Sequence, residues 1–484
     1  MKRTVIPLIA LLAVVPVAAA SAQGQGGALD PSFGTGGRIE AYSLQYTGAM
    51  VLRPDGKIVV AGFCCENRES PVPELAIAGY DQSGSQNFGN QLDAARGSWA
   101  TAAVLQPDGK IVVAGIYEGG LLARFNADGS LDQSFGSDGI SSAGLSEFAP
   151  SSVILQPGGK IVVVGTTNAF LPYSGDPSQP PEFALARFDQ NGSLDSTFGS
   201  NGLVTTSFGG SDYVNAAAQQ ADGKIVVAGF RGFVASGGGS YDEGVLARYN
   251  PDGSIDTSLK IVGGRIVDSV LVQPNGKILV GDFDPGLNNS GELRRYNPDG
   301  TPDSSFTSNP APTSALALEP DGKIVAAGGG IMRFNADGTP DPSFGGVETT
   351  TGLVRVPSFG AVTIAVQPDG KIVAAGGDRH GVALVRILPD SSQTLVVKRR
   401  GRARGTIVSN PLGITCRRPH GRRKPQLHGT CSQLFAQGST VQLVAQNAHG
   451  SILTWGGACA GRRRSCTVTM NGDRTVVAAF TRKR

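Results

Sequence analysis

One short motif occurs seven times in the chain, and this repetition restricts the fold more than any other feature. The motif places a turn of the type Pro-Asp-Gly-Lys before the apolar run Ile-Val-Val-Ala-Gly. Its turn glycines lie at positions 56, 109, 159, 223, 276, 322 and 370, about 50 residues apart. A fixed period of this length is typical of a propeller or another array in which each unit packs against its neighbours.

Each copy of the motif predicts a β-hairpin. Asp-Gly or Asn-Gly between two apolar runs supplies the positive φ angles that tight β-turns require. The run after the turn, such as Ile58–Ala61, is continuously apolar and rich in β-branched residues. Such a run is typical of a strand that is buried on both faces.

A second motif, Ala-Arg-Phe-Asn-x-Asp-Gly-Ser-Leu-Asp-x-Ser-Phe-Gly, follows the hairpins. Its clearest copy runs from Arg124 to Gly136, and the others are Arg187–Gly199, Arg248–Asp256, Arg295–Phe306 and Arg333–Gly345. It supplies a third strand, a turn and a fourth strand. Four strands in each unit of about 50 residues indicate the blade of a β-propeller.

The two ends of the repeat region predict a closed ring. The seventh unit stops after Arg386–Asp390 and lacks the segment Leu-Asp-x-Ser-Phe-Gly, whereas Leu29–Gly34 near the N-terminus supplies that segment. An N-terminal strand would therefore complete the last blade and remove the exposed sheet edges of an open array. The fold class that we predict is all-β, with a seven-bladed β-propeller closed by an N-terminal strand.

Both motifs resemble the delta-60 repeat of bacterial exported proteins. The hallmark sequences Leu-Asp-x-Ser-Phe-Gly and Gln-Pro-Asp-Gly-Lys-Ile-Val-Val-Ala-Gly are present almost verbatim, and the resemblance covers residues 29–390. It implies a propeller fold and export from the cell. It implies no activity.

The first 22 residues have the pattern of a secretory signal peptide. Lys2 and Arg3 precede the apolar stretch Val5–Val17, and small residues lead to a cleavage site after Ala22. A membrane anchor is the alternative, but two prolines interrupt the stretch, and a span needs about 20 apolar residues. We expect a secreted or extracellular mature protein, in part associated with the cell envelope, without a transmembrane segment.

Composition and charge divide the mature chain into two parts. Hydrophobic residues make up 40% of the chain, which excludes a long disordered polymer of charged residues. Residues 394–484 contain 17 Lys and Arg and one acidic residue, which is a net charge of +16. The whole chain carries +3, so residues 1–393 carry −13. We expect the propeller at 23–390 and a basic β-domain at 391–484.

The C-terminal part predicts a small, disulfide-bonded β-domain. Alternating β-runs cover most of residues 394–481, and four cysteines lie among them: Cys416, Cys431, Cys459 and Cys466. In an exported domain an even number of cysteines indicates disulfides, and four allow three pairings. Zinc is the alternative, but neither neighbouring pair has Cys-x-x-Cys spacing.

The same part resembles the internalin B-type bacterial repeat. The matching segments are Gly405–Ser409, Gly413–Cys416, Thr454–Cys459, Cys466–Met470 and Val476–Phe480. The resemblance implies an extracellular, β-rich module of surface proteins. A single copy does not make the long stalk of an adhesin.

Clusters of basic residues make the module a candidate anion-binding unit. The candidate residues are Arg399, Arg400, Arg422, Arg423, Arg462, Arg463 and Arg464. The partner that we expect is an anionic envelope polymer or an acidic glycan. The alternatives are general basicity or docking onto the acidic propeller. Aromatic residues are not interleaved with the arginines, so sequence-specific binding of nucleic acid is not expected.

Features that recur in every unit of the propeller are expected to be structural. The arginines of the second motif, Arg124, Arg187, Arg248, Arg295, Arg333 and Arg386, should hold turn carboxylates or carbonyls, and Gly79 replaces the arginine in the first unit. The run Asn126–Asp132 is similar to the start of a calcium loop. It lacks the closing Glu, which favours a turn bonded by its own side chains.

Ligand contacts are expected where the units differ. If each Asp-Gly-Lys turn joins the two inner strands, the next connection lies on the opposite face, and it is long in several units. Polar candidates on that face are Tyr173, Asp176, Tyr241, Asp242, Asp282, Asp284, Asp378 and His380. Cys64 and Cys65 are adjacent in the first long connection. They could form a vicinal disulfide, remain free thiols or form an intermolecular disulfide, and the sequence does not distinguish these states.

The function that we predict is non-catalytic binding or scaffolding. The propeller contains one histidine, His380, and neither a nucleophile elbow nor a phosphate loop. We therefore expect no catalytic residues, metal or cofactor, and a monomer. The alternative is an exported propeller enzyme that acts on a glycan or lactone, with paired carboxylates across the central channel.

Overall fold

The structure is a computed structural model of the chain. It describes residues 27–64, 72–168, 180–234, 240–262, 264, 266–282, 291–311, 313–328, 330–344, 353–356, 359–378, 381–389, 392–401, 403, 405–410, 414–417, 431–436, 440–446, 451–470 and 472–482. The signal peptide predicted at 1–22 lies outside these residues. None of the helices in the described part has the length and apolar character of a membrane span.

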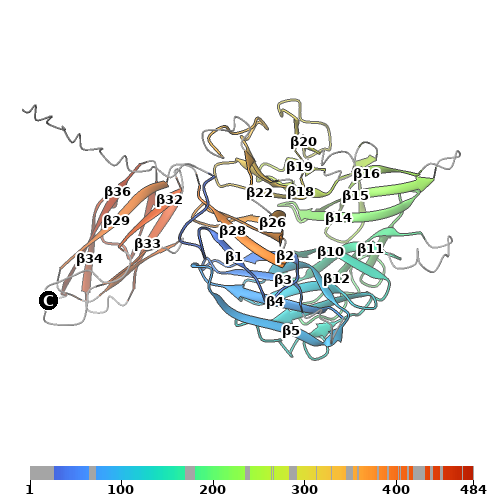
Figure 1. Cartoon of the computed structure of the whole chain (residues 1–484), viewed down its shortest axis with the longest axis horizontal. Coiled ribbons are helices and arrows are strands. Elements are labelled where there is room, and N and C mark those ends of the chain that lie inside the picture. Colours follow the sequence, from blue (N-terminus) through green and yellow to red (C-terminus); the bar gives the residue numbers. More distant parts are fainter. Residues whose placement is uncertain are drawn as a thin grey trace, which may run out of the picture.

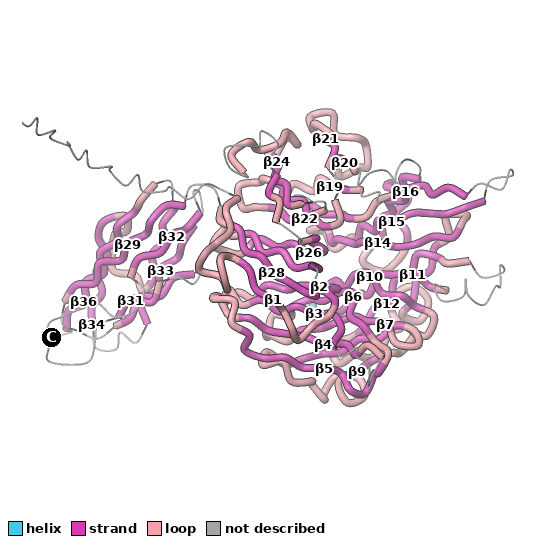
Figure 2. The backbone as a smooth tube through the Cα atoms, in the orientation of Figure 1, coloured by secondary structure: helices cyan, strands magenta, loops and turns pink. Residues whose placement is uncertain are grey.

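Residues 38–387 form seven four-stranded antiparallel sheets, the blades of a propeller (Figures 1 and 2). Blade 1 comprises β2 (Tyr46–Leu52), β3 (Ile58–Cys64), β4 (Glu74–Tyr80) and β5 (Gln86–Arg96); blade 2, β6 (Trp99–Leu105), β7 (Ile111–Ile116), β8 (Gly120–Phe125) and β9 (Ile140–Ser141); blade 3, β10 (Phe148–Leu155), β11 (Ile161–Thr167), β12 (Glu182–Phe188) and β13 (Leu203–Thr206); blade 4, β14 (Ser211–Gln219), β15 (Ile225–Val234), β16 (Ser240–Tyr249) and β17 (Ile255–Val262). Blade 5 comprises β18 (Ser269–Val272), β19 (Ile278–Gly281), β20 (Glu292–Tyr296) and β21 (Asn309–Pro310); blade 6, β22 (Ala315–Leu318), β23 (Ile324–Ala327), β24 (Ile331–Phe334) and β25 (Leu353–Val354); and blade 7, β26 (Gly360–Val366), β27 (Ile372–Asp378), β28 (Gly381–Ile387) and β1 (Arg38–Glu40). A single 3-10 turn, Pro157–Gly159, replaces the Asp-Gly turn of blade 3.

The ring is closed as the sequence predicts. The first strand of each blade contacts the first strand of the next blade, and β26 contacts β2. The N-terminal strand β1 pairs with β28 in the register Arg38↔Val385, and an isolated bridge joins Leu29 to Ile387. The prediction of a seven-bladed propeller closed by an N-terminal strand is confirmed.

The core consists of apolar layers between adjacent blades. In β3, Ile58 and Val60 pack with Val373 of blade 7, whereas Val59 and Ala61 pack with residues of blade 2. Since successive side chains of a strand point to opposite faces, both faces of this strand are buried. This packing explains the continuous apolar run after each Asp-Gly-Lys turn.

A buried ionic cluster, called here the clamp, holds the outer part of a blade. In blade 2, Arg124 Nε lies 2.6 Å and Lys110 Nζ 2.8 Å from the same carboxylate oxygen of Asp132. The Arg124 guanidinium lies 4.6 Å from the centre of the Phe135 ring and also donates a hydrogen bond to the Gln190 carbonyl in blade 3. One arginine thus joins two strands of its own blade to the next blade.

The clamp recurs in five further blades. Its members are Arg187, Asp195 and Lys160; Arg248, Asp256 and Lys224; Arg295, Asp303 and Lys277; Arg333, Asp341 and Lys323; and Arg386, Asp30 and Lys371. In blade 1, the Phe88 ring packs so closely on Gly79 that a β-carbon would not fit there. The structural role predicted for these arginines is confirmed.

The clamps predict that the propeller loses stability in acid. Burial alone would raise the pKa of Asp30, but the hydrogen bond from Ser32 and the charges of Lys371 and Arg386 lower it to about 2. The pKa of Asp132 is lowered as well, because bonds from Lys110 and Ser134 outweigh its burial. These carboxylates bind fewer protons in the folded than in the unfolded chain, so their stabilisation is complete above pH ~4 and is lost as the pH falls toward 2.

Thermal unfolding followed by circular dichroism at pH 7, 5, 4, 3 and 2 measures this effect. We expect similar midpoints at pH 7 and 5 and a steep fall below pH 4. A midpoint that stays constant down to pH 2.5 would contradict the role of the clamps.

Residues 392–482 form two four-stranded sheets that pack face to face, and we call this unit the basic module (Figure 1). One sheet has the order β32 (Ser432–Ala436), β29 (Ser392–Arg400), β36 (Arg474–Arg482) and β34 (Ser451–Gly457); the other has β31 (Thr415–Arg417), β30 (Thr406–Asn410), β33 (Thr440–Gln446) and β35 (Ser465–Thr469). Leu395 and Phe480 of the first sheet share a core with Ile407 and Leu443 of the second. The small β-domain predicted at the C-terminus is confirmed as a sandwich.

Candidate functional site

The blades present two different faces to solvent. The first strand of each blade ends at the Asp-Gly-Lys turn, so these turns and the Asp-Gly turns of the second motif share one face, the turn face. The connections from the second to the third strand and from blade to blade lie on the other, the loop face. This arrangement follows from strand direction in an antiparallel sheet.

On the turn face, the calcium-like run Asn126–Asp132 forms a turn bonded by its own side chains. Asp128 Oδ1 accepts hydrogen bonds from the amide and hydroxyl of Ser130, at 3.0 and 2.7 Å. Asn126 Nδ2 donates to the Ser130 hydroxyl at 3.0 Å, and Asp132 belongs to the clamp. Asp128 Oδ1 and both oxygens of Asp132 are therefore engaged within the protein.

On the loop face, several predicted site residues lie outside the described residues. These are Tyr173, Asp176, Asp284 and His380, together with Cys65. Asp378 ends β27 and pairs with Gly381, and Tyr241 lies in β16 opposite Phe233. Cys64 ends β3, is buried and is disulfide-bonded.

Asp282 holds the loop-face end of blade 5 together, which differs from the ligand contact expected from the sequence. Its exposed fraction is 2%, and its carboxylate accepts a hydrogen bond from the amide of Glu292. Its second oxygen lies 3.3 Å from Arg294, and its carbonyl accepts the amide of Thr313. Asp282 thereby ties the end of β19 to the start of β20, and its side chain is buried.

Asp242 is the predicted residue that the structure places beside a half-buried aromatic pair. The side chain of Asp242 is exposed, at the loop-face end of β16. Burial, and next the nearby charge of Asp242, raise the pKa of Tyr213. Tyr213 is stacked on Phe230 with 5.1 Å between ring centres.

Asp212 is a buried carboxyl group that sequence reasoning missed. Its exposed fraction is 0%, one oxygen accepts the Phe208 amide at 2.6 Å, and the other has no hydrogen-bond partner within the described residues. Burial raises the pKa of Asp212, against the effects of the Phe208 bond and of Arg231. The surrounding run Ser-Phe-Gly-Gly-Ser-Asp is typical of a surface connection, so the sequence carries no signal for this burial.

The inner strands carry a ring of equivalent residues eight positions before each turn glycine. They are Gly48, Thr101, Ser151, Asn215, Asp268, Ser314 and Val362. Ser151 Oγ donates to the Val214 carbonyl at 2.8 Å and Asn215 Nδ2 to the Val267 carbonyl at 3.1 Å, each in the next blade. Asp268 is the one carboxyl group of this ring, whereas glycoside hydrolysis uses two.

Exposed apolar side chains gather near the loop face, and the sequence analysis did not select them. The exposed fractions are 84% for Tyr42, 45% for Tyr46, 38% for Val72 and 38% for Val362. Tyr46 begins β2, Val72 precedes β4, Val362 lies near the start of β26, and Tyr42 lies in the connection from blade 7 to blade 1. The candidates had been chosen for polarity and loop length, and aromatic residues at strand ends fit neither criterion.

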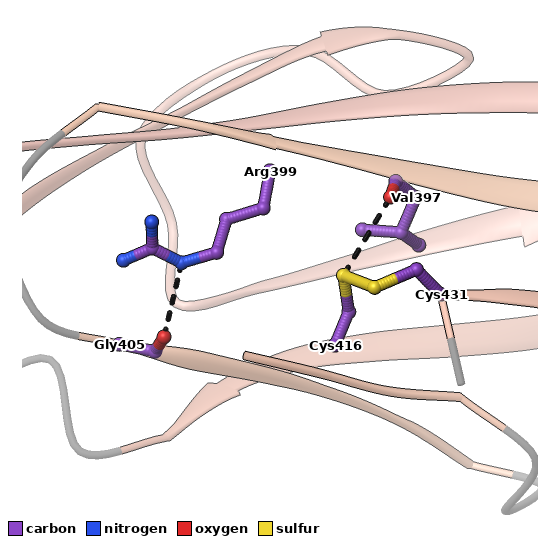
Figure 3. The surroundings of a disulfide bond; sticks show 5 residues. All are labelled: Val397, Arg399, Gly405, Cys416 and Cys431. Atoms are coloured by element: carbon purple, nitrogen blue, oxygen red, sulfur yellow. Dashed lines mark hydrogen bonds between the residues drawn. A yellow bond between two sulfur atoms is a disulfide. The ribbon is translucent and has the colours of Figure 1, made fainter. Parts of the chain in front are cut away.

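In the basic module, Arg399 is part of the core. Its exposed fraction is 9%, and its guanidinium donates to the carbonyl of Gly405 at 3.2 Å (Figure 3). It also donates to the carbonyl of Gly401 at 3.2 Å and to that of Ala403. It also lies 4.6 Å from the centre of the Phe480 ring. Arg399 therefore holds the fold of the module, in contrast to the anion contact expected from its place in a basic cluster.

Two disulfides join neighbouring cysteines, Cys416 to Cys431 and Cys459 to Cys466. The structure thus selects one of the three pairings that the sequence leaves open. Cys416 is fully buried, and its bridge lies beneath β29, next to the Val397 carbonyl (Figure 3).

Replacing Cys416 and Cys431 together by Ala is expected to lower the free energy of unfolding of the module by about 3 kcal/mol, because their bridge closes a loop of 15 residues. Replacing Cys459 and Cys466 by Ala should lower the free energy of unfolding less, because these cysteines are only 7 residues apart. Urea unfolding of the two double variants compares them. Equal losses, or no loss from the first pair, would contradict this expectation.

Arg462, Arg463 and Arg464 lie on a loop with a fixed backbone, which we call the arginine loop (458–464). The Cys459–Cys466 disulfide closes this loop. The amide and indole Nε1 of the buried Trp455 donate to the carbonyls of Gly461 and Arg463, both at 2.8 Å, and the Ala445 amide donates to that of Arg464 at 2.9 Å. All three arginines are exposed, and none has an ion-pair partner in the described part of the chain.

Other basic residues of the module are more scattered. Arg400 and Lys398 are exposed on β29, and Arg417 is exposed on β31. Arg422 and Arg423 lie outside the described residues. Asp473, the one acid among residues 394–484, accepts the Thr394 amide at 2.6 Å.

Comparison with known proteins identifies the repeats. Six segments match the family described as a β-propeller domain of unknown function, DUF5122: residues 106–135, 156–198, 220–259, 273–306, 319–344 and 367–393. No curated protein matches the chain.

Two solved structures show a distant likeness. A protein of unknown function from Bacteroides caccae is 13% identical with a TM-score of 0.34, over 55% of this chain and 81% of that one. Sqt1 from Chaetomium thermophilum is 11% identical with a TM-score of 0.39, over 73% and 82%. A likeness at this level carries no functional argument. The closed ring of seven sheets shows that the repeat region of this chain is a β-propeller, and the family match shows that its repeats are similar to those of a β-propeller family.

Proposed function

We propose that this chain is an exported, non-catalytic binding protein whose basic module attaches it to an anionic envelope polymer. The observation that carries the proposal is the arginine loop. A disulfide and three backbone hydrogen bonds fix its main chain, while three guanidinium groups stay exposed. Little backbone entropy is lost when such a loop binds, and guanidinium groups suit phosphate and carboxylate ligands.

Export is supported by three features. The first 22 residues have the pattern of a signal peptide. The module contains two disulfides, which persist in oxidising compartments. The resemblances to the delta-60 repeat and to the internalin B-type repeat both imply an exported protein.

The connection between the two parts leaves the loop face free. Ile387 at the end of β28 pairs with Ile372, the first residue after an Asp-Gly-Lys turn, so the chain leaves the propeller on the turn face. The module begins at residue 392 and is therefore joined to that face. A propeller held through the module can present its loop face to a partner.

The alternative, an enzyme that acts on a glycan or lactone, receives no support from Asp212. A raised pKa is useful for a general acid. However, Asp212 has an exposed fraction of 0%, so a substrate cannot reach its carboxyl group.

Binding of the full-length protein to long-chain polyphosphate, with dextran as the neutral control, tests the proposal. We expect binding to polyphosphate alone, and a logarithm of the binding constant that falls linearly with the logarithm of the salt concentration. Binding that is equal for both polymers, or independent of salt, would overturn the proposal.

A further inference from the structure

We infer that the loop face of blades 1 and 2 binds a peptide segment rich in Lys or Arg. The inference rests on the proposed function, in which the propeller binds a partner, and it names the class of that partner. The surface consists of Tyr46, Val72, Trp99, Tyr117, Glu118 and Glu147, which we call the blade 1–2 surface.

Apolar side chains of this surface come from both blades. Tyr46 is stacked on Phe63 with 5.6 Å between ring centres. A β-carbon at Gly97 would lie 3.6 Å from Val72 and 4.0 Å from Tyr117, so these side chains flank one glycine. Trp99 is half-buried and is the first residue of β6. The next residue, Ala100, contacts Gly48 of β2 through its carbonyl, so Trp99 lies close to the contact between β2 and β6. Exposed apolar side chains that adjoin one another commonly mark an interaction site.

The charged part of the surface has one sign. Segments 41–47, 72–74, 97–101, 116–120 and 142–149 contain neither Lys nor Arg, and their glutamates are Glu118, Glu147 and the buried Glu74. Glu118 and Glu147 are exposed, and within the part of the chain that the structure describes neither carboxylate has an ion-pair or hydrogen-bond partner. The turn with Glu118 packs on the connection with Glu147, since a β-carbon at Gly119 would collide with the Ser146 carbonyl.

Charge complementarity decides which partner fits. Aromatic rings attract cations through their faces, and adjacent carboxylates add a direct ionic attraction. On the turn face the carboxylates of the clamps are already paired with Lys and Arg of the propeller, so they offer a partner little charge. The blade 1–2 surface combines the exposed ring of Tyr46 and the half-buried rings of Trp99 and Tyr117 with the carboxylates of Glu118 and Glu147, and a cationic peptide satisfies both.

The test is binding of fluorescein-labelled decalysine to the full-length protein at low salt, with decaglutamate and chitohexaose as comparison probes. Replacing Glu118 and Glu147 together by Gln should weaken decalysine binding about three- to tenfold. Tyr46→Leu, which keeps an apolar side chain but removes the ring, should weaken it about two- to fivefold.

Asp108→Asn with Asp138→Asn is the matched control. This variant removes the same charge from the turn face of blade 2. Both substitutions should be tolerated, because blade 5 has Asn275 at the position equivalent to 108, and because Asn accepts the positive φ of Asp138. We expect decalysine binding by this variant to equal that of the parent.

Equal weakening by the control variant would overturn the inference, because the attraction would then come from overall charge. Binding of chitohexaose in place of decalysine would overturn it in favour of a glycan. Neither outcome affects the polyphosphate experiment, which depends on the module, so failure of this inference and failure of the proposed function are distinguishable.

Discussion

Arg386→Met is expected to lower the free energy of unfolding by about 3–5 kcal/mol, the range for breaking a buried ion pair from one side. The Arg386 and Asp30 side chains are 3% and 4% exposed, with 2.8 Å between Nε and Oδ2. Arg386 also lies 4.5 Å from the centre of the Phe33 ring and donates to the Gln82 carbonyl at 2.6 Å. Without the guanidinium, Asp30 keeps a buried charge that Lys371 alone must balance. Urea unfolding at pH 7 measures the loss.

Arg386→Met should loosen the N-terminal segment that closes the ring before the other blades unfold. Asp30 and Phe33 belong to the segment that the N-terminus contributes to blade 7, so Arg386→Met should make residues 27–40 sensitive to limited proteolysis first. Asp30→Asn in the Arg386→Met background should recover part of the stability, because the buried carboxylate loses its charge while Lys371 keeps Asp369 as a partner at 3.4 Å. A loss below 1 kcal/mol, or cleavage that begins in the middle blades, would contradict this account of the closure.

Replacing Arg462, Arg463 and Arg464 together by Gln is expected to weaken binding to polyphosphate about 100-fold, since each basic residue near an anionic surface contributes about 1 kcal/mol. The substitution keeps the backbone hydrogen bonds and the disulfide that hold the arginine loop, because these involve carbonyls and cysteines. Fluorescence anisotropy with labelled polyphosphate measures the change.

The control is a second triple variant with the same loss of charge, Lys398→Gln, Arg400→Gln and Arg417→Gln. These residues are exposed but lie on strands of different sheets. If presentation by the fixed loop matters, the control should weaken binding at least tenfold less than the loop variant. Equal weakening by both variants would show that only the overall charge of the module counts.

The propeller could be predicted because its determinants are local and repeated. Each Asp-Gly turn fixes a hairpin, and runs such as Ile58–Ala61 must lie between two other layers. The closure followed from a missing Leu-Asp-x-Ser-Phe-Gly segment at one end and its presence at Leu29–Gly34. The partners of the clamp arginines could also be expected, since Arg, Lys and Asp recur together in the repeat.

The positions of single charged side chains were harder to predict. Arg399 stands in the run Lys398–Arg400, which indicates a basic surface, yet Leu395, Val397 and Arg399 share the buried face of β29. The alternation of side chains along a strand would have assigned Arg399 to the core. Asp282 follows the apolar run of β19, and only the three-dimensional contacts with Arg294 and Glu292 show that it closes the end of the sheet.

The loop face was the right place to look for differences between blades, but polarity was an incomplete guide to its residues. Val72, for example, lies beside Gly97, and Tyr117 lies against the same glycine. Those neighbours come from different blades, so no single repeat reveals them. The pairing of Tyr213 with Phe230 is likewise a contact between strands.

The most direct test of the central claim is sedimentation of the purified full-length protein with bacterial cell envelopes over a series of salt concentrations. We expect the parent protein to sediment at low salt and to be released steeply as salt rises, and the Gln variant of Arg462, Arg463 and Arg464 to stay in the supernatant throughout. Sedimentation of the Gln variant equal to that of the parent, or binding of the parent that salt does not weaken, would contradict attachment through the basic module.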